Sequence, residues 1–193
     1  MHIKEKIILA SRSPRRAKIL RELGFKFIVC PADIKEERVL KKGPAYLVKL
    51  NALKKAKVVA KKFKEGIVIG MDTIVYVKKK IIGKPKNYRE AKKFLRIFST
   101  YPHWVYTGIA VVDIKRKRYY LDYEKTKLLF RRLSKREIDR YVSQYVSLDR
   151  AGGIDIEKEG KELVKEIRGD YYNVVGFPIK KFIFLIRKIK KKN

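Results

Sequence analysis

The chain has 193 residues, and its 51 lysines and arginines outnumber its 20 aspartates and glutamates, which gives a formal net charge of +31 at pH 7. Hydrophobic residues make up 46% of the sequence, too many for a disordered basic tail and enough for one domain with a full core. The single cysteine, Cys30, excludes an intrachain disulfide framework, and no apolar run is long enough for a membrane span or a signal peptide. The composition therefore predicts one cytoplasmic domain, residues 1–193.

The first part of the chain alternates short apolar runs with helical patterns. Ile7–Ala10 predicts a buried strand. Ser13 followed by Pro14 is typical of a capped helix start, and Gly24 marks the end of that helix. Apolar residues then recur every three or four positions over Ala45–Phe63, which predicts a second helix.

The middle of the chain predicts a strand, a helix and a long hairpin. Ile67–Val77 is a strand pattern with Asp72 at its centre, and Asn87 is placed to cap the helix that follows. Trp104–Ile114 and Tyr119–Leu133 flank a short basic turn, which is the pattern of a β-hairpin.

The last part of the chain adds two helices and two short strands. Ser134 and Glu137 form a capping box at the start of one helix, and Pro178 begins the other. Leu163–Ile167 and Tyr171–Val175 have strand-like composition. Because strands and helices alternate and a hairpin is included, the sequence predicts an α/β fold on a mixed sheet.

The segment around the first predicted helix start has the composition of an anion site. Backbone N–H groups at a helix N-terminus lack partners, and they lie beside the hydroxyls of Ser11 and Ser13 and the guanidinium groups of Arg15 and Arg16. These are the donors that suit phosphate oxygens. An ordinary capped helix with solvated arginines is the alternative interpretation.

Asp72 is the most informative residue of the sequence. It lies between two apolar runs in a predicted strand, where aspartate is a poor strand former and an unpaired carboxylate is costly to bury. A metal ion, a lysine or a catalytic role explains such a position, and we favour a function. A structural ion pair, or a strand that ends at Gly70 and leaves Asp72 exposed, is the alternative.

Four further residues give weaker signals. Lys84 lies in a stiff Gly-Lys-Pro turn, where a lysine is usually exposed, and Glu36 stands in an acidic loop. His103 has no second ligand or triad partner in the sequence pattern, and Cys30 follows an apolar run as a small core residue does. Individually, none of them predicts a function.

Together, however, the segments resemble the Maf family of nucleoside triphosphate pyrophosphatases over nearly the whole chain, from Ser11 to Pro178. The resemblance rests on motifs in the family's order: Leu9–Arg16, Glu36, Lys55, Gly70–Thr73, Gly83–Pro85, Ser99, His103, Thr107–Gly108, Asp149–Gly153 and Gly169–Pro178. Each motif is short, and the ordered series is specific.

The resemblance implies an elongated α/β fold of the Maf and ITPase type, with a mixed sheet flanked by helices and a cleft between two lobes. It also implies a homodimer and an enzyme that hydrolyses a nucleoside triphosphate to the monophosphate and pyrophosphate. A divalent metal cation, Mg²⁺ or Mn²⁺, is the implied cofactor. Phosphoryl transfer depends mainly on positioning and on neutralising phosphate oxygens, which agrees with a site rich in cations.

The resemblance also implies roles for individual residues. Asp72 is the implied general base, Glu36 helps to place the metal or the water, and these two carboxylates are the implied metal ligands. Lys84 is the third implied catalytic residue. It is also implied to hold the triphosphate, together with Ser11, Arg15, Arg16 and Lys55. The implied substrate-binding residues are Ser11, Arg15, Arg16, Lys55, Thr73 and Glu157.

Base preference is indicated by four positions. Arg15 with Arg16 after the proline, and Thr73 after the aspartate, resemble the family branch that acts on dTTP and UTP. Glu157 stands near a position where that branch has glutamine, and an acidic residue there is closer to the branch associated with 7-methyl-GTP. Ionised glutamate only accepts hydrogen bonds, whereas glutamine also donates them. We expect a pyrimidine triphosphate, with 7-methyl-GTP as the alternative.

The net charge of +31 supports a different class of hypothesis, a nonenzymatic nucleic-acid-binding protein with its basic cluster at Lys54–Lys64. The aromatic residues fall mostly at core-like spacings, so specific nucleic-acid binding is not favoured, and no membrane partner is expected. A role in regulating cell division, which the family resemblance also suggests, does not exclude the enzyme. Most of the excess charge is interpreted as a surface that steers anionic substrates.

Overall fold

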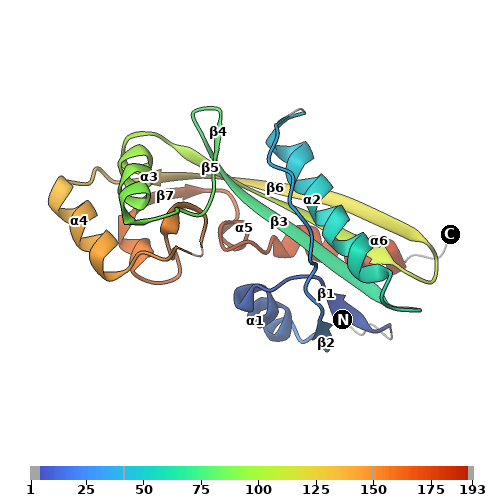
Figure 1. Ribbon diagram of the computed structural model, residues 1–193. Coiled ribbons are helices and arrows are strands. Elements are labelled where there is room, and N and C mark those ends of the chain that lie inside the picture. Colours follow the sequence, from blue (N-terminus) through green and yellow to red (C-terminus); the bar gives the residue numbers. More distant parts are fainter. Residues whose placement is uncertain (1–4, 41, 149, 191–193) are drawn as a thin grey trace. The chain divides into compact units, whose positions relative to one another are not determined.

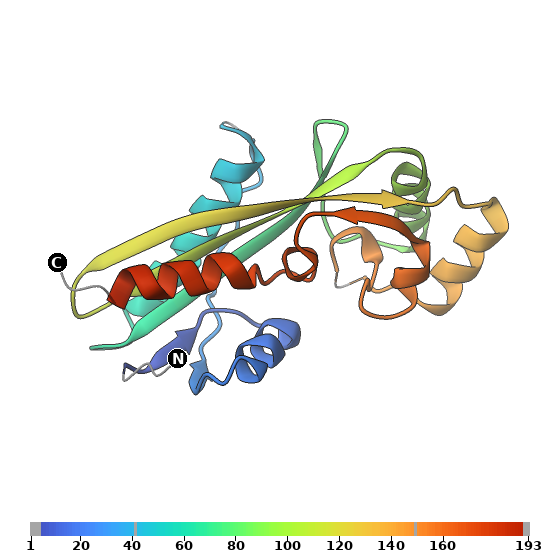
Figure 2. The same ribbon diagram turned by 180° about the vertical axis from the view of Figure 1, so that it is seen from behind.

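The structure, a computed structural model, describes residues 5–40, 42–148 and 150–190 (Figures 1 and 2). The chain folds into two compact units, each assembled from segments that are distant in the sequence. The first unit comprises Met1–Thr73, Thr107–Glu124 and Gly176–Asn193, and the second comprises Ile74–Tyr106 and Lys125–Val175. The single domain expected from composition stays a prediction.

The helices and strands follow one another in alternation along the chain. In order they are β1 (Ile7–Leu9), α1 (Pro14–Glu22), β2 (Phe27–Val29), α2 (Gly43–Ala60), β3 (Ile67–Val77), β4 (Lys80–Ile82), α3 (Tyr88–Thr100), β5 (His103–Asp113), β6 (Arg118–Phe130), α4 (Lys135–Gln144), the 3-10 helices η1 (Ala151–Gly153) and η2 (Glu159–Leu163), β7 (Val164–Arg168), α5 (Tyr171–Val174) and α6 (Ile179–Lys190). Among these, β3, β5 and β6 contribute residues to both units.

The strands form one mixed seven-stranded sheet in the order β2-β1-β3-β5-β6-β7, with β4 paired to β3. Strand β1 is parallel to β2 and to β3, where Ile7 pairs with Ile67 and Leu9 with Ile69. Strand β4 is antiparallel to β3, and β7 is antiparallel to β6. The predicted α/β fold on a mixed sheet is therefore confirmed.

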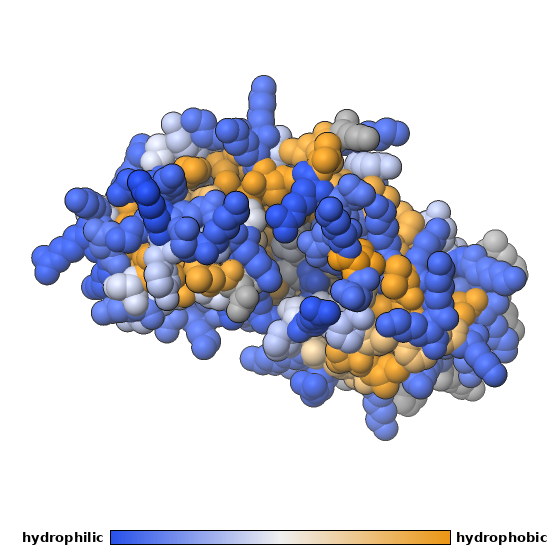
Figure 3. All heavy atoms as spheres, viewed as in Figure 1, coloured by the Kyte–Doolittle hydropathy of each residue, from blue (hydrophilic) through white to orange (hydrophobic). Residues whose placement is uncertain are grey.

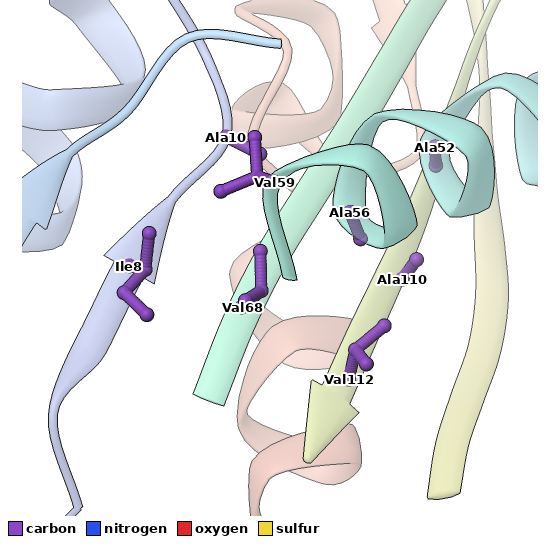
Figure 4. Close-up of a cluster of buried hydrophobic side chains, with 8 residues drawn as sticks. All are labelled: Ile8, Ala10, Ala52, Ala56, Val59, Val68, Ala110 and Val112. Atoms are coloured by element: carbon purple, nitrogen blue, oxygen red, sulfur yellow. The ribbon is translucent and has the colours of Figure 1, made fainter. Parts of the chain in front are cut away.

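In the first unit, α2 and α6 cover opposite faces of the sheet (Figures 1 and 2). The core beneath α2 consists of small and β-branched side chains from the helix and from β1, β3 and β5 (Figure 4). Its buried members are Ile8, Ala10, Ala52, Ala56, Val59, Val68, Ala110 and Val112. These side chains fill the space between the helix and the sheet.

The second unit has an aromatic centre. His103, at the start of β5, packs between Phe98 of α3 and Phe130 of β6, with ring centroids 4.4 Å and 4.9 Å away. Gly152 lies over the same cluster, where a Cβ would come within 2.7 Å of the Phe98 ring. Its φ of 72° is a further reason for glycine at this position. His103 is 2% exposed and so occupies a core position.

Most sequence-based predictions of helices and strands are confirmed. Strand β3 has the predicted bounds, Ile67–Val77, and β5 and β6 are hydrogen-bonded neighbours, as the hairpin requires. Ser13 and Asn87 accept the N-terminal hydrogen bonds of α1 and α3. The predicted capping box opens α4, and the helix predicted over Ala45–Phe63 is α2, shifted by two or three residues.

The strand predicted at Tyr171–Val175 is wrong, because most of this segment is the short helix α5. Asp170 caps the helix, and its side chain accepts a hydrogen bond from the backbone N–H of Tyr172. Gly169, with a φ of 127°, ends β7 and turns the chain before this cap. The aromatic and β-branched composition favoured a strand, and the local cap outweighs it.

Two short strands were not predicted. Strand β4 follows a two-residue turn, Lys78–Lys79, in which both residues have positive φ (46° and 61°). Such hairpin turns usually carry asparagine or glycine, so a pair of lysines gives no turn signal. Strand β2, at Phe27–Val29, has three residues that stand beside β1. None of the helices in the described part of the chain has the length and apolarity that crossing a bilayer requires.

The buried histidine predicts a pH dependence of stability. Burial lowers the pKa of His103 from 6.5 to about 4. Between these two values the unfolded chain binds more protons than the folded protein, so the free energy of unfolding rises with pH through this window and is lost as pH falls. The expected contribution is about 3 kcal/mol at most.

Urea denaturation of the wild type and His103→Phe at several pH values tests this prediction. Phenylalanine keeps a ring between Phe98 and Phe130 but does not titrate. We expect the difference in stability between the two proteins to change between pH 4 and 6.5 and to be constant above pH 7. A constant difference over the whole range contradicts the prediction.

Candidate functional site

The centre of the candidate site is Asp72, which the first unit holds in a continuous strand. Its side chain is almost fully buried, with 4% of the residue exposed. Asn51 Nδ2 donates to its Oδ2 atom over 3.0 Å, and Lys55 Nζ lies 2.7 Å from its Oδ1 atom. The alternative in which the strand ends at Gly70 and exposes Asp72 is therefore wrong, whereas an ion pair with a lysine is present.

Both partners of Asp72 come from α2, one helical turn apart. Residues at positions i and i+4 of a helix share one face, so Asn51 and Lys55 point at the sheet together. The helix reaches the sheet because two glycines face it. A Cβ at Gly70 would lie 2.2 Å from the carbonyl oxygen of Ala52, and one at Gly108 would lie 2.3 Å from that of Val48. Any side chain at these positions would displace α2.

Lys55 bridges two carboxylates. Besides Asp72, its Nζ atom lies 2.6 Å from Glu36 Oε1 and donates a longer hydrogen bond, 3.4 Å, to the carbonyl oxygen of Met71. An ammonium group has three donors, so these contacts occupy all of them. The Lys55 side chain is 12% exposed and that of Glu36 is 44% exposed. Glu36 therefore faces solvent, whereas Asp72 lies behind it.

The loop that carries Glu36 has no regular secondary structure and is held by Asn51. The Asn51 side-chain amide accepts from the backbone N–H of Glu37 and donates to its carbonyl oxygen, over 2.9 Å and 3.0 Å. The second amide hydrogen is the one donated to Asp72. Lys54 adds an exposed ion pair to the Glu37 side chain. One buried asparagine thus links the buried carboxylate to the loop that carries the exposed one.

The sequence analysis gave Asn51 no role, although Asn51 lies in the same helix as Lys55. The available signal was a polar residue within the apolar stripe of α2, exactly one turn before a lysine. Asn51 is 1% exposed and is flanked along the stripe by Leu47, Val48 and Ala52, which are also buried. A buried amide needs partners for its oxygen and both of its hydrogens, and such a residue indicates a neighbouring loop or site.

The predicted anion site lies where β1 ends and α1 begins. Ser13 caps α1 and accepts a hydrogen bond from the backbone N–H of Arg16, while Ser11 Oγ accepts one from the backbone N–H of Ser13. Both hydroxyls act as acceptors in these bonds, so their own protons are available for other partners. Arg15, in the first turn of α1, is half-buried. The segment therefore combines a helix N-terminus, two hydroxyls and a guanidinium group.

Arg16 differs from its neighbour because it is buried. Its Nε donates to the carbonyl oxygen of Gly176, Nη1 donates to Ser11 Oγ and to the carbonyl oxygen of Met71, and Nη2 donates to Thr73 Oγ1. Burial lowers the pKa of Arg16 to about 10, against the opposing effect of the Asp72 carboxylate. Arg16 remains a cation at neutral pH.

The other two site residues predicted from the family resemblance, Lys84 and Glu157, belong to the second unit. Both side chains are exposed. Lys84 follows Gly83, whose carbonyl oxygen accepts a hydrogen bond from the backbone N–H of Gly152 over 2.9 Å. The backbone N–H of Glu157 donates to Asp155 Oδ1 over 3.2 Å. Within this unit, the Gly83–Pro85 turn is therefore hydrogen-bonded to η1, which contains Gly152 and Gly153.

Arg150, in the motif Asp149–Gly153, forms an ion pair with Asp155. Asp155 is buried, and its carbonyl oxygen also accepts the backbone N–H groups of Lys158 and Gly160. Lys158 and Glu159 lie in the turn that these bonds close. Asp149, the first residue of this family motif, lies outside the described residues.

A divalent cation fits the carboxylates of the first unit in one particular way. Among the described residues, no three histidine, cysteine, aspartate or glutamate side chains come together as a metal cage. Asp72 and Glu36, however, both contact the same Lys55 ammonium group, so their oxygens converge on one cationic position. Mg²⁺ typically takes one or two carboxylates and completes its shell with waters and substrate phosphates. The two carboxylates match that donor set.

The fold and the site define a class of protein: an α/β protein whose buried carboxylate lies among cations beyond the carboxyl end of its first strand. Comparison with known proteins gives the family. A profile described as Maf-like protein matches residues 6–189, so the chain belongs to the Maf-like protein family. The resemblance found from the motifs is thereby confirmed.

Curated relatives are similar over nearly their whole length. The chain is 37% identical over 188 residues to a protein named dTTP/UTP pyrophosphatase from Dictyoglomus thermophilum, covering 97% of each chain. It is 41% identical over 188 residues to a dTTP/UTP pyrophosphatase from Bacillus cereus, covering 97% of this chain and 96% of the relative. Among solved structures, the Staphylococcus aureus Ham1 protein matches 97% of this chain with a TM-score of 0.53 at 14% identity, a likeness that shows the fold alone.

The close approach of α2 to the sheet generates a stability prediction. We expect Gly70→Ala to lower the free energy of unfolding by about 1–3 kcal/mol, because the new methyl group would meet the backbone of α2. Urea denaturation measures the change. Gly83→Ala is the matched control, since a Cβ there has no neighbour within 4 Å and should change stability by less than about 0.5 kcal/mol. Equal effects at the two glycines contradict the prediction.

Proposed function

We propose that the protein is a nucleoside triphosphate pyrophosphatase that hydrolyses dTTP and UTP to the monophosphate and pyrophosphate. Family membership and relatives named dTTP/UTP pyrophosphatase at 37–41% identity support this class of reaction. The observation that carries the proposal is the buried Asp72 carboxylate, held by Asn51 and Lys55 beside an exposed second carboxylate, Glu36. A buried charge held this firmly in the middle of a strand is characteristic of a functional site.

Asp72 serves as the general base in this proposal. Its two oxygens accept one hydrogen bond each from Asn51 and Lys55, and a carboxylate can accept about four, so lone pairs are left for a water molecule. The water oxygen forms a bond to the α-phosphorus, the bond from that phosphorus to the bridging oxygen breaks, and pyrophosphate leaves. The proton of the water passes to the Asp72 carboxylate. Because both partners fix the carboxylate, little reorganisation precedes this step.

Several cations and a serine hydroxyl serve to hold the triphosphate. Ser11 and Arg15, at the start of α1, offer a hydroxyl and a guanidinium group next to a helix N-terminus, which is favourable for phosphate. Lys55 and Lys84 are included on the family resemblance, and for Lys55 an approaching phosphate would compete with Glu36 for the ammonium group. The resemblance also places Arg16 on the triphosphate.

Asp72 and Glu36 would hold the divalent cation, Mg²⁺ or Mn²⁺, together with phosphate oxygens of the substrate. When bound, the metal neutralises charge that develops on the phosphate oxygens. Asn51 contributes by holding both of these ligands, one through its amide and one through the backbone of Glu37. The cofactor and the roles of these residues are part of the proposal.

We assign the base preference to pyrimidines because the relatives compared above share that name. Thr73 and Glu157 are the proposed specificity residues, and 7-methyl-GTP is the alternative substrate because Glu157 is acidic. We also propose a cytoplasmic homodimer on the family resemblance.

A nucleic-acid-binding function is the second candidate, since hydrophilic side chains cover much of the face shown in Figure 3 and the net charge is +31. Such a surface also attracts anionic nucleotides over several ångströms, an effect that salt weakens.

The first test of the function is pyrophosphate release from a panel of nucleotides. We expect turnover of dTTP and UTP with added Mg²⁺ or Mn²⁺, and little without metal. Faster release from 7-methyl-GTP would move the chain to the other branch. Release from no nucleotide, combined with DNA binding that weakens steeply with salt, would replace the enzyme with the nucleic-acid-binding hypothesis.

The second test is Asp72→Asn, which keeps the shape of the side chain but removes its ability to accept a proton. We expect kcat to fall by about 10²–10⁴ with nucleotide binding largely retained, because a general base contributes that much. Asp139→Asn is the matched control, since Asp139 also pairs with a lysine, Lys92 at 2.6 Å, but on the surface. Retained turnover in Asp72→Asn would remove Asp72 from the role of base.

A further inference from the structure

We propose that Arg16 is a positioning residue, which fixes the Asp72 segment of β3 from the face opposite α2 instead of binding the triphosphate itself. This inference rests on the proposed function for its kinetic consequences. Its structural basis is independent of that function, because it follows from the partners of the guanidinium group and from the geometry of a β-strand.

A count of hydrogen-bond donors argues against a direct phosphate contact. A guanidinium group has five N–H donors. Four of them are used within the protein, on Gly176, Ser11, Met71 and Thr73, over distances of 2.9–3.2 Å. The residue is also only 9% exposed. To bind a phosphate bidentately, Arg16 would have to give up bonds that the buried acceptors would then lack.

The acceptors of Arg16 lie on either side of Asp72 in the sequence. Nη1 binds the carbonyl oxygen of Met71, the residue before Asp72, and Nη2 binds the hydroxyl of Thr73, the residue after it. Successive side chains of a strand point to opposite faces, so Thr73 points away from the face on which Asp72 meets α2. Arg16 therefore holds the strand from one face, while Asn51 and Lys55 hold the carboxylate on the other.

The carbonyl oxygen of Met71 needs this partner because the neighbouring strand has ended. Strand β1 pairs with β3 only from Ile7 to Leu9, and the last backbone bond between them joins the N–H of Ala10 to the carbonyl oxygen of Ile69. Beyond that point the edge of β3 has no ladder partner from β1. Arg16 fills the place of the missing strand, and Lys55 adds a longer bond to the same oxygen.

Thr73 extends the network. Its hydroxyl accepts from Arg16 and lies 3.0 Å from the hydroxyl of Thr107 on β5. Gly176, with a φ of 92°, supplies the carbonyl oxygen for Nε, and a Cβ there would lie 3.2 Å from Thr73 Oγ1. Thr73, Thr107 and Gly176 are each the terminal residue of a segment of the first unit. Arg16 thus binds Gly176 and Thr73 directly and is linked to Thr107 through the Thr73 hydroxyl. At each of these three residues the chain enters or leaves the first unit.

The two roles predict different effects of Arg16→Lys. Lysine keeps the charge, which suffices for a phosphate contact, but its single nitrogen cannot hold Gly176, Met71 and Thr73 at once. For a positioning role, we expect kcat to fall roughly a hundredfold. KM and the dissociation constant of inorganic tripolyphosphate, measured by calorimetry, should stay within about twofold. Arg15→Gln should show the opposite pattern, with weaker tripolyphosphate binding.

Thr73 gives a second, coupled readout. Because Arg16 acts through Thr73, the loss in kcat for Thr73→Val and that for Arg16→Lys should not multiply in the double variant. Thr73→Ser, which keeps the hydroxyl, should recover at least half of the activity lost in Thr73→Val. Lys18→Gln, on the exposed side of α1, is the control for Arg15→Gln, which also removes a positive charge from that helix. Thermal unfolding shows whether each variant is folded at the assay temperature.

A readout without turnover separates this inference from the proposed function. The side-chain carboxyl carbon of Asp72, assigned by comparison with Asp72→Asn, should shift in the NMR spectrum of Arg16→Lys and not in that of Lys18→Gln. If no nucleotide is hydrolysed by the wild type, the proposed function fails, and this shift still decides the positioning role. The inference is overturned if the Asp72 carboxyl resonance does not shift in Arg16→Lys. It is also overturned if Arg16→Lys keeps the kcat of the wild type while Arg16→Gln weakens tripolyphosphate binding about tenfold.

Discussion

The burial of one carboxylate, that of Asp72, is the constraint on which the rest of the site depends. An ionised carboxylate in a protein interior requires charged and hydrogen-bonding partners, and those partners must reach the middle of a strand. Helix α2 supplies Asn51 and Lys55, and it can do so only because Gly70 and Gly108 let its backbone approach the sheet. Gly70 and Gly108, which belong to two separate motifs, are therefore both needed for α2 to reach the Asp72 carboxylate.

The same constraint explains why the polar side chains around Asp72 use almost all of their hydrogen-bond donors. Asn51 uses its whole amide group, Lys55 uses all three of its donors, and Arg16 uses four of its five on the opposite face of β3. A reacting group must be held close to its productive geometry, and side chains locked by a surrounding shell of hydrogen bonds achieve this best. By contrast Glu36 is half-exposed and lies on an irregular loop.

The sequence predicted those parts of this arrangement that have a local signature. The apolar runs on either side of Asp72 define β3, and the capping residues define the starts of α1, α3 and α4. The family resemblance supplied Lys55 and Glu36, which spacing alone would not have connected. The sequence did not predict the role of Asn51 or the burial of Arg16, because both depend on contacts with residues distant in sequence. Tyr171–Val175 was wrong because the cap by Asp170 outweighs strand propensity.

The network also changes how the charge of +31 is interpreted. Two of the cations nearest to Asp72, Lys55 and Arg16, direct their hydrogen bonds to acceptors of the protein. Their charges therefore act first on the carboxylate and its strand, and only then on a ligand. In the proposed function, cations with exposed side chains, such as Lys84, supply the long-range attraction for a triphosphate. The buried cations thus fix the position of Asp72, and the exposed cations attract an anionic ligand from a distance. Salt screens exposed charges much more than buried ones, so only the long-range attraction should weaken with salt.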